Sequence, residues 1–431
     1  MLALESLVGD VAPGPLSALR ARALARVRAA GVPTVREEAW KYTDLRLVRE
    51  GTFSTTPPVA ASSLTELHPL LDSCNSRLVF VDGGLDQRLS RLDTLPAGVR
   101  LRSFRDVQSS EPDALALLLD RYATEEAQVF AALNAANARD GAVIDLDAGV
   151  VLAQPLMVAF LHTAAAARLF STPLLIVRAA RDSHVRVLEL HHGETGALNL
   201  AAPLTHLAAD AGSQIEHWRV QHEAAGAIHL AHVEAAVGAN ARVATHGFAF
   251  GARLARVEIA ATLEAPGAGV VMNGLFHAGA GQHLDHQTRI DHRAPHTTSE
   301  ELFKGLAGGD GRGVFRGQVV VRQDAQKIAA RQASHNLLLS ADAEIDTKPE
   351  LEIYADDVSC AHGATVGQLD DAALFYLRSR GVPEVEARAL LVFGFTQEVV
   401  EQVAFEPLRG WLAGQLAGNS EVPLPKLEEF E

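Results

Sequence analysis

The sequence predicts a mainly β chain with helical segments at both ends. Hydrophobic residues make up 48% and charged residues 21% of the 431 residues, which supports a sizeable core and excludes global disorder. Between residues 141 and 321, short aliphatic and β-branched runs follow one another, separated by Gly, Asn or Asp. No clear amphipathic helix interrupts them, which argues against alternating βαβ units. At roughly 150 residues per domain, the length predicts about three domains.

The first part of the chain predicts helices and short strands. Residues 16–31 follow Pro13 and Pro15 and keep an apolar stripe up to Gly31, which is typical of a helix with a glycine stop. Residues 113–137 have Ala- and Leu-rich helical spacing. The apolar runs at residues 77–81 and 99–102 are strand-like.

The central part predicts many short strands, at residues 143–146, 155–160, 174–177, 185–190, 214–218, 242–246, 257–260 and 314–321. Two architectures fit this pattern: a large antiparallel sandwich, or a parallel β-helix whose coils stack strand on strand. There is no strict sequence repeat, and the irregular strand lengths slightly favour the β-helix. The residues alone leave both architectures open.

Two helices are predicted after the strands. Asp370 and Asp371 begin the first helix, which ends at Gly381, and Pro383 opens the second. These placements fit the helix dipole and the preference for proline at helix starts and glycine at helix ends. The second helix carries an apolar stripe at Val385, Ala389, Val392, Val399 and Val403.

Charge and cysteine content narrow the function classes. With 38 Lys and Arg against 53 Asp and Glu, the net charge is −15, so we expect no binding to nucleic acid or anionic membranes. The sequence contains no uninterrupted apolar run of about 18 residues, so we expect no membrane span. The first residues lack the basic segment of a secretory signal, and two cysteines suit a reducing compartment. We therefore expect a cytoplasmic protein.

Cys360 and His362 form the strongest candidate metal site. In a strand, residues two apart project from one face, so a thiolate and an imidazole would lie side by side. This pair of ligands suits iron or zinc. A buried cysteine beside a histidine that is bonded to a backbone carbonyl would give the same pattern.

The number of cysteines limits what this site can hold. An iron–sulfur cluster usually needs about four protein ligands, mostly thiolates. The chain has only Cys74 and Cys360, which fall in different predicted domains. If the chain contacts a cluster, the remaining ligands must come from another chain or from groups other than cysteine.

Other motifs favour structural roles. Asp356 and Asp357 are neighbours, so in a strand they would face opposite sides and make a poor catalytic pair. The glycine-rich residues 308–313 lack a following Lys-Ser/Thr, so they predict a turn, and we expect no ATP site in this chain. We interpret five closely spaced histidines as surface and turn residues rather than a metal site: His277, His283, His286, His292 and His296.

A block of motifs near the C-terminus resembles the SufB/SufD family of iron–sulfur cluster assembly proteins. The motifs are Asp285-His-Gln-Thr288, His292-Arg-Ala-Pro-His296, Phe303-Lys-Gly305, Val314-Phe-Arg-Gly317, Ala325-Gln-Lys327, Asn336-Leu-Leu-Leu-Ser340, Thr347-Lys-Pro-Glu-Leu-Glu-Ile353, Asp356-Asp-Val-Ser-Cys-Ala-His-Gly-Ala-Thr-Val-Gly-Gln-Leu-Asp370 and Leu374-Phe-Tyr-Leu-Arg-Ser-Arg-Gly381. Near the N-terminus, Arg36-Glu-Glu-Ala-Trp-Lys-Tyr-Thr43 is similar to the SufD branch of the family. SufB-type chains are longer and often carry extra cysteines, which are missing here.

The resemblance implies a right-handed parallel β-helix flanked by helical domains. The expected parts are a mostly helical domain at residues 1–140, the β-helix at 141–366, a helical domain at 367–418 that docks an ATPase, and a mobile tail at 419–431. A chain of this kind would be a scaffold subunit without catalysis of its own. It would pair with SufB and bind the ABC-type ATPase SufC.

The resemblance also implies site residues. Cys360 and His362 match the element near the SufB–SufD interface, with His362 the better ligand of a transient iron–sulfur cluster shared with SufB. The residues that match the SufC-docking segment are Leu374, Phe375, Arg378, Arg380, Val385 and Val392. Two alternatives are a SufB-like scaffold that holds a cluster alone, which the cysteine shortage disfavours, and a β-helix enzyme acting on polysaccharide. The second is disfavoured by the expected lack of a signal peptide and by the helical C-terminal part.

Overall fold

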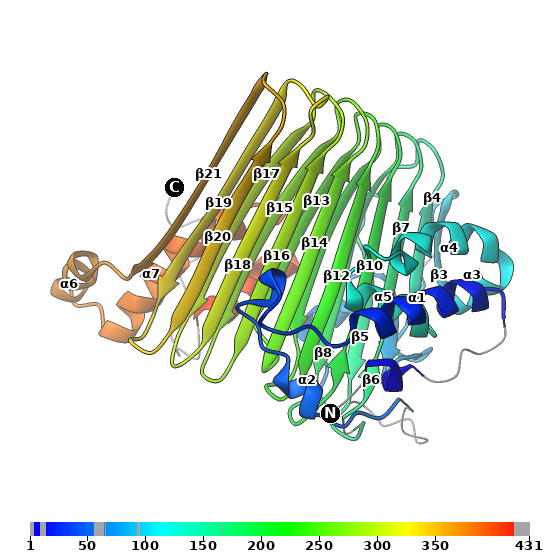
Figure 1. Ribbon diagram of the computed structural model, residues 1–431. Coiled ribbons are helices and arrows are strands. Elements are labelled where there is room, and N and C mark those ends of the chain that lie inside the picture. Colours follow the sequence, from blue (N-terminus) through cyan, green and yellow to red (C-terminus); the bar gives the residue numbers. More distant parts are fainter. Residues whose placement is uncertain are drawn as a thin grey trace.

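Two parallel β-sheets wind around a common axis and form a β-solenoid, with helices packed at both ends of the chain (Figure 1). The computed structural model describes residues 4–8, 14–55, 64, 66–92, 95–166 and 168–417. The parallel pairing confirms the predicted β-helix and decides against the antiparallel sandwich. The tail predicted at residues 419–431 lies outside the described residues.

Short helices and strands precede the solenoid. They are η1 Leu4–Leu7, α1 Ser17–Ala30, η2 Glu38–Trp40, α2 Arg46–Glu50, η3 Pro69–Ser73, β1 Ser76–Val81, β2 Gly84–Leu85, β3 Val99–Ser103, α3 Phe104–Ser110, α4 Pro112–Leu119, η4 Asp120–Ala123 and α5 Val129–Asn137. The single helix predicted at residues 113–137 is wrong, because the chain breaks there into α4, η4 and α5. The break lets the buried Tyr122 hydroxyl reach His206 Nδ1 at 2.8 Å.

The solenoid strands alternate between the two sheets. They are β4 Ala142–Leu146, β5 Leu156–His162, β6 Phe170–Ser171, β7 Leu174–Ala179, β8 His184–Gly193, β9 Leu200–Ala201, β10 Leu204–Ala209, β11 Gln214–His222, β12 Ile228–Val237, β13 Arg242–Ala249, β14 Leu254–Leu263, β15 Gly269–Ala278, β16 His283–His292, β17 Thr298–Ala307, β18 Arg312–Val321, β19 Ile328–Leu338, β20 Glu344–Ile353 and β21 Val358–Gln368. The first sheet runs β2-β1-β5-β8-β11-β13-β15-β17-β19-β21, and the second runs β20-β18-β16-β14-β12-β10-β7-β4-β3.

The pairing register shows how one turn stacks on the next. Gln214 lies opposite Arg242, Arg242 opposite Gly269, and Gly269 opposite Thr298. These steps differ in length, and no residue type recurs along them, which explains why the sequence shows no strict repeat. Because side chains alternate along a strand, opposite residues in stacked strands point to the same side.

Each sheet has an inner face and an outer face that helices cover in part (Figure 1). The interior is largely aliphatic and aromatic, with Val187, Val243 and Phe303 in one buried cluster. The N-terminal helices cover the second sheet, where Val27 of α1 belongs to the same buried cluster as Leu230. No helix within the described ranges is both long and apolar enough to cross a lipid bilayer.

The C-terminal helices follow β21, and the last two of them cover the first sheet (Figure 1). They are α6 Asp371–Ser379, α7 Glu384–Val400 and α8 Glu406–Ala417, and residues of α7 and α8 share a buried cluster with Trp218. Asp370 caps α6 by accepting the Ala372 amide at 2.9 Å, and Pro383 precedes α7, as predicted. The second helix ends at Val400, so the prediction that Val403 lies on it is wrong. Val403 lies in the connection between α7 and α8, where it is buried in the same cluster.

Candidate functional site

The two ends of the solenoid differ in how their edge strands are finished. At one end, the outermost strands are the short β2, which forms a hairpin with β1, and β3, which runs antiparallel to β4. We call this the closed end, and the opposite end the open end. At the other end lie β20 and the eleven-residue β21, and within the described chain β21 pairs only with β19. A long strand with one unpaired edge offers a row of backbone donors and acceptors to another chain.

Cys360 and His362 lie on this edge strand. Cys360 is opposite Ala330 and His362 is opposite Gln332, whose side chain is buried in the solenoid. Both candidate ligands therefore lie on the inner side of β21, at the open end, where His362 is exposed and Cys360 half-buried. Burial raises the pKa of the Cys360 thiol above its ordinary value, so the isolated chain carries a thiol there at neutral pH.

A polar ladder leads from His362 into the interior. Glu301 is opposite Gln332 in the next turn, so three polar residues lie on consecutive strands. The Gln332 side-chain amide donates to Glu301 Oε2 at 2.6 Å. Desolvation raises the pKa of Glu301 to about 7. A carboxylic acid thus lies two strands beneath the open edge and changes charge near neutral pH.

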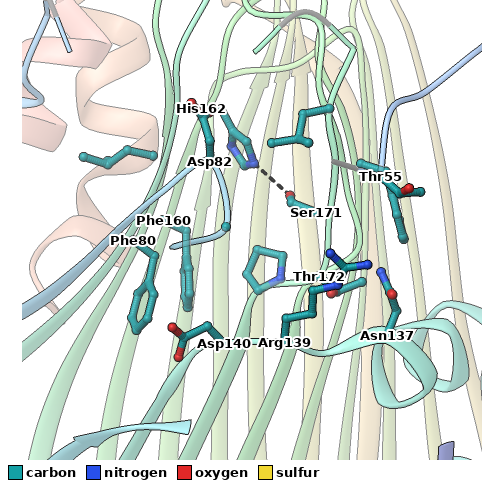
Figure 2. A pocket seen from close by; sticks show the side chains of 15 residues that line it. Thr55, Phe80, Asp82, Asn137, Arg139, Asp140, Phe160, His162, Ser171 and Thr172 are labelled. Carbon is teal, nitrogen blue, oxygen red and sulfur yellow. Dashed lines mark hydrogen bonds between the residues drawn. The ribbon is translucent and has the colours of Figure 1, made fainter. Parts of the chain in front are cut away.

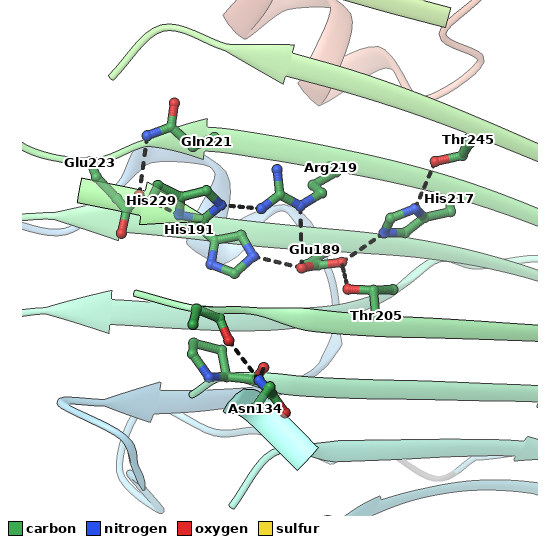
Figure 3. Close-up of polar contacts among 12 residues, drawn as sticks. Asn134, Glu189, His191, Thr205, His217, Arg219, Gln221, Glu223, His229 and Thr245 are labelled. Carbon is green, nitrogen blue, oxygen red and sulfur yellow. Dashed lines mark hydrogen bonds and ion pairs between the residues drawn. The ribbon is translucent and has the colours of Figure 1, made fainter. Parts of the chain in front are cut away.

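Deeper in the solenoid, a buried network surrounds Glu189 (Figure 3). Its carboxylate contacts His191 Nε2 at 2.6 Å and His217 Nε2 at 2.9 Å. Thr205 donates to Glu189 at 2.7 Å, and Arg219 Nε lies 3.5 Å away. Burial works to raise the pKa of Glu189, but the histidine hydrogen bonds and the Arg219 charge hold it well below its ordinary value.

A second buried carboxylate, Glu223, extends this network. Its oxygens lie 2.6 Å from His229 Nδ1 and 3.1 Å from the donating amides of Asn199 and Gln221. Burial works to raise the pKa of Glu223, and the neighbouring histidines bring it far below its ordinary value. Both carboxylates are thus charged and partnered, which makes the network a stable polar core within an otherwise apolar solenoid.

A small cavity of about 50 Å³ lies near the closed end of the solenoid, far along the chain from β21 (Figure 2). Phe80 and Phe160 stack on one side of it, with ring centroids 5.3 Å apart. His162 Nε2 lies 2.8 Å from Ser171 Oγ, which also lines the cavity. The volume suits a few water molecules rather than a large cofactor.

Two sequence motifs that lie far apart along the chain meet on the second sheet. Trp40, from the N-terminal motif, packs 3.8 Å beneath the Arg256 guanidinium. Arg256 pairs with Asp285 at 2.5 Å, and Thr43 donates to the same carboxylate. The N-terminal motif at residues 36–43 therefore packs against the start of the Asp285 motif.

Comparison with known proteins agrees with this architecture. Residues 160–395 match the core domain of the SufB and SufD proteins of the SUF system for iron–sulfur cluster assembly, and residues 4–158 match the N-terminal region of the same proteins. The chain belongs to the SufB/SufD family. This confirms the prediction made from the motifs.

The similarity to known proteins extends over most of the chain. An iron–sulfur cluster assembly SufBD family protein of Synechocystis is 30% identical over 88% of this chain and 86% of its own length. The iron–sulfur cluster assembly protein SufD of Escherichia coli is 30% identical over 88% of this chain and 87% of its own length. A chloroplastic protein of Arabidopsis thaliana is 24% identical over 96% and 89% of the two chains.

In this SufB/SufD chain, the six residues predicted to dock an ATPase differ in their surroundings. Phe375 and Val385 are 74% and 69% exposed, whereas Leu374 and Val392 are buried in the chain's own helices. Two further predicted residues hold the helices in shape: Arg378 pairs with Glu384 at 3.4 Å, and Arg380 lies over the Tyr376 ring. The exposed apolar pair is the part that a partner could contact.

The interpretation of the five histidines as surface and turn residues holds fully only for His296, which is exposed in a turn. His277 and His283 are half-buried in strands, and the other two are buried. His286 is buried and stacks on Phe276 with ring centroids 4.9 Å apart. His292 is buried between Thr297 and Ser299, with contacts of 2.7 and 3.0 Å. A sequence pattern typical of such buried polar residues is a pair of polar residues two apart in a run that is otherwise apolar, such as Glu189 and His191.

Proposed function

We propose that this SufB/SufD family chain is a SufD-type scaffold subunit for iron–sulfur cluster assembly and transfer. In this proposal it has no turnover of its own, pairs with SufB and binds the SufC ATPase. The observation that carries the proposal is the pairing of Cys360 and His362 on the inner side of an unpaired edge strand. A transient cluster would sit there, between this chain and SufB.

The ligand count supports a shared site. Cys74 is 2% exposed, and burial raises its pKa to about 11, so it is an inert core residue. Cys360 is then the only thiol in the sequence that is available to a cluster. Because a cluster takes about four ligands, Cys360 and His362 would supply two of them, and SufB would supply the others. Mixed thiolate and imidazole ligation would also suit a cluster that is passed on.

The C-terminal helices give SufC a surface and a mechanical connection. Phe375 and Val385 offer exposed apolar side chains. Lys304 of β17 donates to the Phe395 carbonyl of α7 at 2.8 Å and pairs with Glu398 at 2.8 Å. A pull on α7 by a closing ATPase would therefore be transmitted to the first sheet, which ends at β21.

The histidine at the edge provides the direct test. We expect His362→Ala to lower the iron and sulfide content of the complex co-purified with SufB and SufC, while the complex still assembles. His335→Ala is the matched control, because His335 lies on the preceding strand and bonds Thr365 at 3.0 Å on the other face. Unchanged cluster content in His362→Ala would show that this histidine is structural.

Reconstitution of the chain alone tests sharing. Under anaerobic conditions with iron and sulfide, the lone chain should hold little stable cluster because it lacks ligands. Stoichiometric cluster on the isolated chain would instead favour the SufB-like scaffold.

A further inference from the structure

Three histidines from separate segments meet on the outer side of the first sheet. His68 precedes η3, His192 lies in β8 and His222 lies in β11. One ligand atom from each lies within 4.8 Å of the other two. Within the described ranges, this is the one group of three or more His, Cys, Asp or Glu side chains that comes together in this way.

The strand register brings two of these residues together. His192 is directly opposite His222 in the parallel pair, so both rings leave the sheet on the same side. The rings stack with centroids 5.8 Å apart, and His68 meets each of them edge-on. The stacking of solenoid turns thus builds two sides of the site, and the segment before η3 supplies the third.

Each ring has a buried nitrogen without a hydrogen-bond partner among the described residues. These atoms are His68 Nε2, His192 Nε2 and His222 Nδ1. Buried polar atoms in folded proteins nearly always have a hydrogen-bond partner, so three unpaired nitrogens in one place are a departure from ordinary packing. A cation bound through these nitrogens would supply the partner that each lacks, once the His68 hydrogen has moved to Nδ1.

The surroundings favour neutral imidazoles, the form that binds metals. Desolvation lowers the pKa of His68 to about 3 and of His222 to about 4, and burial also lowers the pKa of His192. Trp411 of α8 closes one side, with its centroid 4.9 Å from the His68 ring and 5.5 Å from the His222 ring.

The hydrogen bonds of the other ring nitrogens orient two of the rings. His192 Nδ1 donates to the His222 carbonyl at 3.1 Å, which leaves its Nε2 with a free lone pair. Metal-binding histidines are commonly oriented in this way. His68 Nδ1 accepts the Leu70 amide at 3.2 Å, so its hydrogen is on Nε2 in the unliganded chain. Coordination through Nε2 would move that hydrogen to Nδ1 and break this long bond.

We infer that His68, His192 and His222 form a binding site for a divalent transition-metal ion of borderline softness, such as Zn²⁺. Three imidazole nitrogens leave a fourth position of a tetrahedral site for water. The site is separate from the edge strand β21 and does not depend on the proposed cluster role. The same contacts with Trp411 would hold α8 against the first sheet, so the ion would stabilise this junction.

Zinc binding by the full-length chain tests the inference. After treatment with a chelator, the protein is equilibrated with Zn²⁺ alone and desalted, and the zinc retained per chain is measured. We expect stoichiometric zinc in the wild type and background levels in His192→Ala and His222→Ala. His246→Ala is the control, because His246 is a buried histidine of the same sheet outside the cluster, and it should retain the metal.

Thermal unfolding identifies variants that lose the metal only because they do not fold. Zn²⁺ should raise the melting temperature of the wild type and of His246→Ala, but not of a folded His222→Ala chain. The inference is overturned if the wild type retains no zinc and shows no shift. It is also overturned if both cluster variants retain zinc like the wild type, or if His246→Ala loses it equally.

Discussion

Glu301 illustrates how a single residue inside the solenoid departs from its ordinary behaviour. Its side chain is 2% exposed, one oxygen accepts from Gln332, and no cation is close enough to lower its pKa. Glu189 is equally buried but is paired with two histidines and faces Arg219. Partners, rather than depth, therefore decide whether a buried carboxylic acid is charged.

This difference predicts a pH-dependent stability. The folded state raises the pKa of Glu301 from 4.5 to about 7, so its contribution is fully present below pH 4.5 and is lost as the pH rises through 7. Glu301→Gln should match the wild type near pH 4 and be more stable at pH 8, by up to about 3 kcal/mol. Urea unfolding at several pH values measures the difference, with exposed Glu300→Gln as the control. Parallel pH profiles for wild type and Glu301→Gln would contradict it.

At the scale of elements, the helices α6 and α7 carry both buried and exposed apolar side chains. Leu374 and Val392 anchor them in the chain's own core, while Phe375 and Val385 face outward. Neighbours in sequence thus point in different directions because a helix turns about 100° per residue. The buried residues fix the helices, and the exposed residues are left for a partner.

We therefore predict that charges on the exposed face weaken SufC binding without unfolding the chain. Phe375→Glu and Val385→Glu should each reduce the affinity about tenfold or more, since each would bury a charge at an apolar contact. Calorimetric titration with SufC measures this effect. Leu117→Glu is the control, because Leu117 is 82% exposed on α4, among the N-terminal helices. Equal affinity for wild type and both helix variants would exclude this docking surface.

At the scale of the whole molecule, the solenoid has a closed end and an open end. The first turns are finished by a short hairpin and an antiparallel strand, whereas β20 and β21 end the stack with long strands (Figure 1). Natural proteins usually cover or blunt such an edge. We take the uncovered β21 as the surface where SufB would pair, which places Cys360 and His362 next to the joint.

Glycines on this edge allow a selective test of pairing. A Cβ atom added at Gly363 or Gly367 would meet nothing within 4 Å in the isolated chain. Gly363→Glu and Gly367→Glu should therefore fold normally but reduce the heterodimer with SufB, measured as the mass of the co-expressed assembly. Gly410→Glu, at an equally open position on α8, should leave pairing intact. Full heterodimer formation by both edge variants would argue that SufB binds elsewhere.

The sequence by itself determined the elements that depend on local patterns. The strands from residue 143 onward, the capped helix after Asp370 and the family motifs follow from alternation, capping and residue identity. The helix predicted at residues 113–137 was wrong, because the tertiary contact of Tyr122 with His206 outweighs helical propensity there. The number of cysteines also predicts that a cluster bound by this chain would need further ligands from another chain or from groups other than cysteine.

Only the tertiary structure decided which distant residues meet. The meeting of His68 with His192 and His222, the Glu189 network and the contact of Trp40 with Arg256 all depend on how the turns stack. Turns of unequal length hide this register in a linear sequence, because a shift of one residue reverses which side chains face inward. Local physics thus fixes each strand, while long-range pairing fixes the sites between strands.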